Sequence, residues 1–256
     1  MYDIVILDSG VKCNHPLFQN EKPEGFTLKQ NNNEMSVVDD FSDDFGHGTA
    51  IYGIIRSNAI DAKILNIKIC KNSGELSEEA LCQVLQYVNH HIPCSFLNLS
   101  LGLRMLEQSQ KLYSVCYDLK KRGTIVLASF DNEGCQTYPA CFDCVLGVES
   151  RGSRIVSKNE YIWFEHCETN LIANGSTQKV PWLKPDYIFM DGNSIACARA
   201  TGILYTLLKF DNAKTIDQKL TKIMTSAKHI FKLQSNMNNM HNNMIDMHNV
   251  ALFPFN

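Results

Sequence analysis

Short apolar runs alternate with amphipathic segments along this chain of 256 residues. The apolar runs are rich in β-branched side chains, as buried strands are, and the amphipathic segments repeat their apolar positions every three to four residues, as helices do. Predicted strands cover residues 3–7, 62–69, 96–99, 124–128 and 144–148, and predicted helices cover residues 49–56, 76–89, 107–121 and 194–208. This alternation predicts an α/β fold of three layers, α/β/α, with a mainly parallel central sheet.

Polar side chains stand where several of the predicted strands end. Asp8, Ser100 and Asn132 each follow a predicted strand. Because the carboxyl ends of parallel strands meet at one edge of a sheet, and ligands bind there, we expect these three side chains to lie close together.

Composition narrows the class of protein and its surroundings. The net charge is −3, and no run of Lys or Arg is dense enough for a nucleic-acid surface. No apolar stretch is long enough to span a membrane, and the N-terminus has no signal-peptide pattern. The ten cysteines are therefore expected to be reduced, which predicts a cytoplasmic protein.

The chain length and the 45% hydrophobic content suit one large core, and we expect a single domain over residues 1–256. Residues 235–243 are rich in Asn and Met and are expected to form a surface loop. The apolar positions that begin at Met244 are expected to return the chain to the core.

Three short motifs supply an acid, a base and a nucleophile in the order Asp8, His47, Ser194. A serine hydroxyl needs a neighbouring base, imidazole titrates near neutrality, and a carboxylate can fix the tautomer of that imidazole. A tetrahedral oxyanion also needs hydrogen-bond donors, for which the N–H of Ser194 and the amide of Asn132 are candidates. Each residue alone has an ordinary interpretation as a turn, loop or capping residue, but the four would have to coincide in order and flanking sequence.

On these motifs the chain resembles the subtilisin-like serine proteases (subtilases) from about residue 4 to residue 252. The segments that carry the resemblance are Asp8-Ser9-Gly10-Val11, Gly46-His47-Gly48-Thr49, Leu97-Asn98-Leu99-Ser100-Leu101-Gly102, Asn132-Glu133-Gly134, Tyr138-Pro139-Ala140, Gly192-Asn193-Ser194-Ile195-Ala196 and Ile245-Asp246-Met247-His248-Asn249-Val250.

The resemblance implies a serine endopeptidase that works through an acyl-enzyme, without a cofactor or metal. Asp8, His47, Ser194 and Asn132 are its implied catalytic residues. A peptide or protein substrate would add as a strand along Ser100, Leu101 and Gly102, and the residues implied to border its primary pocket are Ser129, Phe130, Asp131 and Glu133.

The chain departs from the family pattern at several positions. Asn193 stands where Thr is usual, Ala198 where Pro is usual, and Asp131 where Gly is usual. Asp131 and Glu133 either favour a basic residue before the cleaved bond or point to solvent. The family's N-terminal pro-domain and its calcium loop are not seen in the sequence. These are features of a minimal, intracellular member with a dedicated substrate, such as the leader of a precursor peptide.

Two alternatives remain at this point. A pseudoprotease would bind peptides without turnover because Phe130 and Asp131 occlude the pocket. A zinc-stabilised regulatory domain would use Cys135, Cys141 and Cys144 with His166 and Cys167, although a single Cys-x-x-Cys is a weak metal signal.

Overall fold

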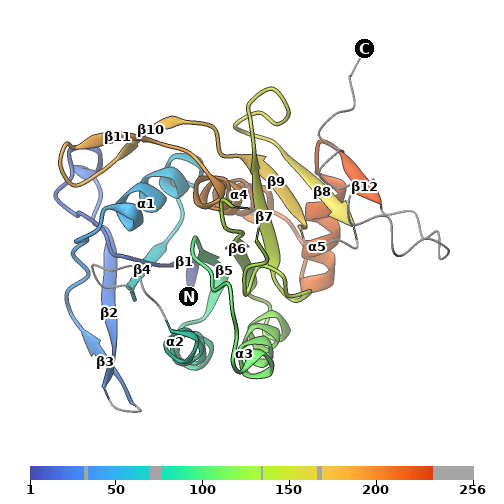
Figure 1. The fold of residues 1–256 in the computed structure, drawn as a ribbon. Helices are drawn as coiled ribbons and strands as arrows, with labels where there is room; N and C mark the ends of the chain where they lie inside the picture. Colours follow the sequence, from blue (N-terminus) through green and yellow to red (C-terminus); the bar gives the residue numbers. More distant parts are fainter. Residues whose placement is uncertain (32–33, 70–76, 134, 166–168, 233–256) are drawn as a thin grey trace.

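A ten-stranded sheet with the order β12-β8-β9-β7-β6-β5-β1-β4-β2-β3 runs through the computed structural model (Figure 1). The structure describes residues 1–31, 34–69, 77–133, 135–165 and 169–232. The strands are β1 (Tyr2–Asp8), β2 (Glu24–Asn31), β3 (Glu34–Val38), β4 (Ile64–Lys68), β5 (Cys94–Leu99), β6 (Ile125–Ser129), β7 (Leu146–Arg151), β8 (Tyr161–Glu165), β9 (Leu171–Asn174) and β12 (Ile230–Lys232), with β10 (Gln178–Pro181) and β11 (Tyr187–Met190) forming a separate hairpin.

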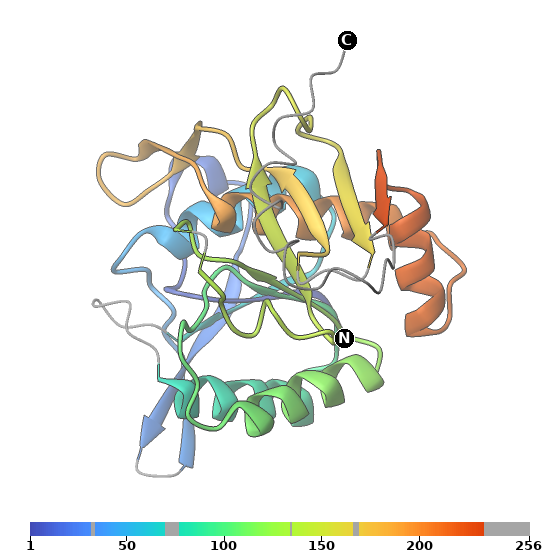
Figure 2. The same ribbon diagram turned by 45° about the vertical axis from the view of Figure 1, so that its right-hand side comes forward.

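Helices cover both faces of the sheet. The helices are α1 (His47–Asn58), α2 (Glu78–His91), α3 (Ser109–Lys121), α4 (Asn193–Leu208) and α5 (Ile216–Thr225), with a short 3-10 helix at Pro16–Phe18. Figures 1 and 2 show α2 and α3 side by side on one face and α1 and α4 on the other. The parallel pairings run from β2 through β4, β1, β5, β6 and β7 to β9, which confirms the predicted α/β fold with a mainly parallel sheet.

Two apolar cores follow from the alternation of side chains along the strands. In β1, Ile4 and Ile6 belong to the core under α1 and α4, whereas Val5 and Leu7 belong to the core above α2 and α3. All four are at most 1% exposed. A strand that is buried on both faces has a continuous run of apolar residues, which is why β1 is easily predicted from the sequence.

The predicted elements are present, with shifted ends. The helix that was expected to begin at Thr49 begins at His47, and the strand that was expected at residues 144–148 runs from Leu146 to Arg151. Ser77 caps α2, since its side chain accepts a hydrogen bond from the N–H of Ala80 at 3.1 Å.

Antiparallel additions at the sheet edges were not predicted. β3 pairs with β2 and β8 pairs with β9 in the antiparallel sense, and β12 then adds to β8 in the parallel sense. Residues 235–243 and the apolar positions from Met244 lie outside the described residues. None of the helices in the described part of the chain has the length and hydropathy needed to cross a bilayer.

Candidate active site

Asp8 and His47 form a close pair at the carboxyl edge of the sheet. Asp8 is the last residue of β1, and His47 is the first residue of α1. His47 Nδ1 lies 2.8 Å from Asp8 Oδ1 and 3.0 Å from Oδ2. Because a carboxylate accepts from Nδ1–H, this contact leaves Nε2 of the neutral ring free to accept a proton.

The surroundings of His47 change its pKa in opposing directions. Burial disfavours the imidazolium, but attraction to Asp8, the hydrogen bond with Asp8 and the more distant charge of Asp43 outweigh burial and raise the pKa of His47 above 6.5. The side chain is still 19% exposed, so a molecule at the surface can reach it. A neutral imidazole with a raised pKa is a stronger proton acceptor than an isolated one.

Asp43, which belongs to none of the sequence motifs, organises the turn that carries His47. Its Oδ1 accepts hydrogen bonds from Ser9 Oγ (2.8 Å), Phe45 N (3.0 Å) and Gly46 N (2.8 Å). Its Oδ2 accepts from Thr49 N (2.8 Å) and Thr49 Oγ1 (2.6 Å). These bonds occupy N–H groups at the start of α1, which explains why the helix begins before Thr49. An Asp four residues before the His was the available signal.

Gly48 lets α1 approach β1 closely. A Cβ atom at this position would stand 2.2 Å from the carbonyl oxygen of Gly10 and 3.2 Å from Asp8 Oδ1. The N–H of Gly48 donates to Ser9 Oγ at 2.9 Å. A side chain here would therefore separate the helix that carries His47 from the strand that carries Asp8.

Ser194 occupies the first turn of α4, where backbone N–H groups have no partner within the helix. Its hydroxyl donates to the carbonyl oxygen of Ser100 at 3.1 Å. Ser100 Oγ lies 3.0 Å from Asn98 Oδ1 and 3.3 Å from the carbonyl oxygen of Ser194. The end of β5 and the start of α4 are therefore joined directly at the predicted nucleophile.

Asn132 lies beside the same helix start. Its Oδ1 accepts a hydrogen bond from the N–H of Asn193 at 2.8 Å. This bond assigns the orientation of the amide, because Oδ1 is the only atom of the group that can accept, and Nδ2 remains a donor. Gly192 permits the approach, since a Cβ there would stand 2.7 Å from Asn132 Oδ1.

The residues predicted to contact substrate differ in exposure. Ser100 is buried, Leu101 and Gly102 are half-buried and exposed respectively, and the next residue, Leu103, pairs with Tyr138 through two hydrogen bonds of 2.8 Å. Ser129 and Phe130 are 4% and 8% exposed, and Phe130 belongs to the core above α2 and α3. Packing of the phenyl ring in that core weighs against its occluding a pocket.

Arg104, which was not predicted from the sequence, pairs with both acidic residues that flank Asn132. Arg104 Nε lies 2.9 Å from Asp131 Oδ2, and Nη2 lies 2.8 Å from Glu133 Oε2. The Asp131 side chain is 13% exposed and the Glu133 side chain 69%. Only Glu133 fits the expectation of a solvent-facing carboxylate, and the charge of Asp131 is balanced within the chain.

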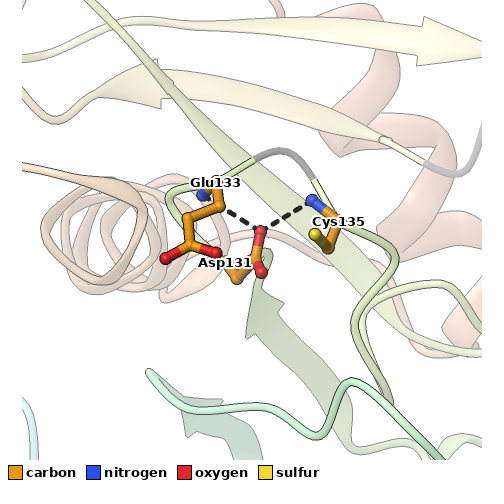
Figure 3. Close-up of side chains that lie close together, drawn as sticks. All are labelled: Asp131, Glu133 and Cys135. Atoms are coloured by element: carbon orange, nitrogen blue, oxygen red, sulfur yellow. Dashed lines mark hydrogen bonds between the residues drawn. The ribbon is translucent and has the colours of Figure 1, made fainter.

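Asp131 also folds its own loop (Figure 3). Its Oδ1 accepts from the N–H of Glu133 at 3.2 Å and from the N–H of Cys135 at 2.8 Å. Among the described residues, the group of three or more ligand-type side chains within 4.8 Å comprises Asp131, Glu133 and Cys135. The guanidinium of Arg104 supplies the positive charge at this cluster, so a metal ion is not needed to balance it.

The proposed zinc cysteines are not gathered in the part of the chain that is described. Cys141 and Cys144 do not join the group around Cys135. Burial raises the pKa of Cys144 to about 11, as in a thiol that packs in a core rather than ligating a metal. His166 and Cys167 lie outside the described residues.

Curated relatives of this chain are proteases of Bacillus subtilis (strain 168). The "Major intracellular serine protease" is 25% identical over 86% of this chain and 72% of its own length. The "Minor extracellular protease Epr" is 24% identical over 83% of this chain, and the match spans 33% of its own length.

Solved structures share the fold. A "cold adapted subtilisin-like serine proteinase" superimposes with a TM-score of 0.68 at 22% identity, covering 86% of this chain and 79% of that protein. A "Lanthipeptide Protease" superimposes with a TM-score of 0.69 at 17% identity, covering 89% of this chain and 80% of that protein.

A family profile decides the assignment that these low identities leave open. The profile described as "Subtilase family" matches residues 3–245. That range contains the segments around Asp8, His47 and Ser194, and it covers nearly the whole chain. The protein therefore belongs to the subtilase family of serine endopeptidases.

Proposed function

We propose that this protein hydrolyses peptide bonds with Asp8, His47 and Ser194 as its catalytic triad. The observation that carries the proposal is the contact of His47 Nδ1 with Asp8 at 2.8 Å and 3.0 Å. This contact prepares the opposite ring nitrogen to accept the proton of a serine hydroxyl.

The chemistry proceeds in two displacement steps. His47 Nε2 takes the proton of Ser194 as Oγ attacks the peptide carbonyl, and the C–N bond then breaks as the imidazolium returns that proton to the leaving amine. Water next attacks the acyl-enzyme, giving up a proton to His47, and the proton returns to Ser194 Oγ as the acid product leaves. In the structure the Ser194 hydroxyl donates to the carbonyl oxygen of Ser100, so this hydrogen bond must break before the proton passes to His47.

The negative charge of each tetrahedral intermediate requires fixed donors. We assign this role to the N–H of Ser194 and to Nδ2 of Asn132. The Oδ1 atom of Asn132 is already occupied by the N–H of Asn193 at 2.8 Å, which leaves Nδ2 for the oxyanion.

The substrate is an extended peptide that adds as a strand along Ser100, Leu101 and Gly102. A substrate dedicated to this enzyme, such as the leader of a precursor peptide, is our prediction for its natural target. Cleavage of a randomised peptide library tests it: a dedicated enzyme selects residues at several positions, whereas a general protease selects at one.

We infer that the protein acts in the cytoplasm. Free thiols such as Cys82, Cys94 and Cys116 are buried in its core, where they act as small apolar groups, and they persist best in a reducing compartment. Cell fractionation tests this assignment, which recovery of the protein from the secreted fraction would contradict.

Labelling with a fluorophosphonate probe separates a protease from a peptide-binding module. The wild type is expected to label at Ser194, while Ser194→Ala abolishes labelling and His47→Ala lowers it strongly. Ser109→Ala, an exposed serine at the start of α3, serves as the matched control and labels normally. A folded wild type that binds peptide but does not label would support the binding module instead.

A further inference from the structure

Asn193 links two segments that flank the candidate site. Its Oδ1 accepts a hydrogen bond from the N–H of Ser150 in β7 at 2.7 Å, and its Nδ2 donates to the carbonyl oxygen of Asp131 at 2.5 Å. The residue is 9% exposed. Both ends of its side-chain amide are therefore used inside the protein, and neither is directed at a ligand.

The backbone of the same residue holds Asn132. The N–H of Asn193 donates to Asn132 Oδ1 at 2.8 Å. Asp131 and Asn132 are thus both hydrogen-bonded to Asn193, Asp131 through its carbonyl oxygen and Asn132 through its side chain. Two bonds to one residue restrict both the position and the tilt of the Asn132 amide, which a single bond would leave free to swing.

The other side of this dipeptide is anchored by Asp131 itself. The N–H of Asp131 donates to Thr137 Oγ1 at 3.1 Å, and its carboxylate accepts from the N–H groups of Glu133 and Cys135. Positions 131 and 193 are where the sequence departs from the family pattern of Gly and Thr. In the folded chain these two residues contact each other, because Asn193 Nδ2 donates a hydrogen bond to the carbonyl oxygen of Asp131.

We propose that Asn193 is a positioning residue of the oxyanion site. Its side-chain amide holds the Asp131–Asn132 peptide against the start of α4 and so keeps Asn132 Nδ2 directed at the developing oxyanion. The inference rests on the proposed function, because the oxyanion contact belongs to Asn132. Asn193 does not touch the substrate and acts only through its neighbour.

The expected kinetic effect follows from displacement of one donor. Removal of an oxyanion donor lowers kcat by about 10²–10³-fold, a magnitude established for the subtilisin family rather than worked out from this structure. A misplacement of about 1 Å costs roughly 10²-fold. Asn193→Ala is therefore expected to lower kcat by about 10–100-fold and to change KM by less than about threefold, since this donor acts mainly in the transition state.

A double-mutant cycle tests whether Asn193 acts through Asn132. The variants are Asn193→Ala, Asn132→Ala and the double substitution, with kcat and KM measured on one peptide substrate. If the proposal holds, Asn193→Ala lowers kcat less than about threefold further once Asn132 is already Ala. Independent, multiplicative losses would overturn it.

A second variant separates the two side-chain bonds. Asn193→Asp keeps an acceptor for the N–H of Ser150 but places an oxygen against the carbonyl oxygen of Asp131. It is expected to lose kcat as Asn193→Ala does. Activity equal to that of the wild type would mean that only the contact with β7 matters, and would overturn the proposal.

Hydrogen exchange gives a readout that does not depend on turnover. The peptide containing Asp131 and Asn132 is expected to exchange faster in Asn193→Ala than in the wild type. The matched control is Asn66→Ala in β4. This substitution removes the hydrogen bond of another buried side-chain amide, from Nδ2 to the carbonyl oxygen of Glu24 at 3.0 Å.

The two readouts distinguish failure of the proposed function from failure of this inference. A wild type that cleaves no peptide refutes the function, while the exchange rates still decide whether Asn193 holds the dipeptide. Equal exchange in Asn193→Ala, Asn66→Ala and the wild type would refute the positioning role.

Discussion

Substitution of Asp43 by Asn removes a charge from the turn that carries His47 while keeping the size of the side chain. The carboxylate accepts from Ser9, Phe45 and Gly46 through Oδ1 and twice from Thr49 through Oδ2. An amide has one acceptor oxygen and one donor nitrogen, so it cannot reproduce this set. The best orientation keeps the bonds to Oδ1 and turns its NH₂ group toward the N–H of Thr49.

The loss of stability can be bounded from these bonds. Hydrogen bonds to a charged group contribute about 1.5–3 kcal/mol each against 0.5–1.5 kcal/mol for neutral pairs, and an unsatisfied buried N–H costs about 1–3 kcal/mol. Part of this loss is offset because the amide costs less to bury than the carboxylate. We expect Asp43→Asn to lower the free energy of unfolding by about 3 kcal/mol, a large fraction of the 5–15 kcal/mol typical of domains.

Urea denaturation measures this change, with Asp44→Asn as the matched control. Asp44, whose side chain is 55% exposed, pairs with Lys68, and ion pairs at the surface contribute about 0–1 kcal/mol. With a slope of about 3 kcal/mol/M, Asp43→Asn should move the midpoint down by about 1 M. The acid limb of kcat/KM should also shift to lower pH, because the charge of Asp43 helps raise the pKa of His47. If Asp43→Asn is no less stable than Asp44→Asn, the turn does not depend on this carboxylate.

Three further predictions concern the same site. Burial lowers the pKa of His47, but attraction to Asp8, the hydrogen bond with Asp8 and the charge of Asp43 together raise it above its ordinary value of 6.5. The value of kcat/KM should therefore fall as pH drops through a midpoint above 6.5, and a midpoint below 6.5 in the pH profile would contradict this. Gly48→Ala should lower both Tm and activity, since its Cβ would stand 2.2 Å from the carbonyl oxygen of Gly10, and calorimetry showing an unchanged Tm would disprove the clash. Arg104→Ala should cost less than about 1 kcal/mol because the side chain is 54% exposed. Arg104→Ala should nevertheless raise kcat/KM for peptides with Lys before the cleaved bond relative to kcat/KM for matched peptides with Glu there. If this ratio is unchanged, the carboxylates of Asp131 and Glu133 lie out of reach of substrate.

The sequence predicted the centre of the sheet better than its edges. β1 and β5 are buried on both faces and therefore appear as continuous apolar runs. The outer strands β2 and β3 contain many polar residues and pair with each other, so their sequence resembles a loop. The register of β2 depends on its pairing with β4, which no local pattern reveals.

Candidate site residues could be predicted from the sequence where they lie within a recognisable motif. Asp43 was missed because an acidic residue before a helix has an ordinary explanation as a cap, although here it also organises the turn that carries His47. Arg104 lies 27 positions before Asp131, and charge patterning gives the sign of such residues without naming their partners. The link from Asn193 to Asp131 likewise joins segments whose proximity only the folded sheet creates.

The helix that carries Ser194 packs directly against the helix that carries His47. A Cβ added at Gly202 in α4 would stand 2.6 Å from the Cβ of Asn58 and 3.1 Å from the carbonyl oxygen of Ile55, both in α1. The relative position of the proposed base and the proposed nucleophile thus depends on a helix crossing more than a turn away from either group. We therefore expect loss of activity on heating to follow unfolding of the packed α1–α4 interface, so that the half-life of activity at high temperature matches the half-life of the fold.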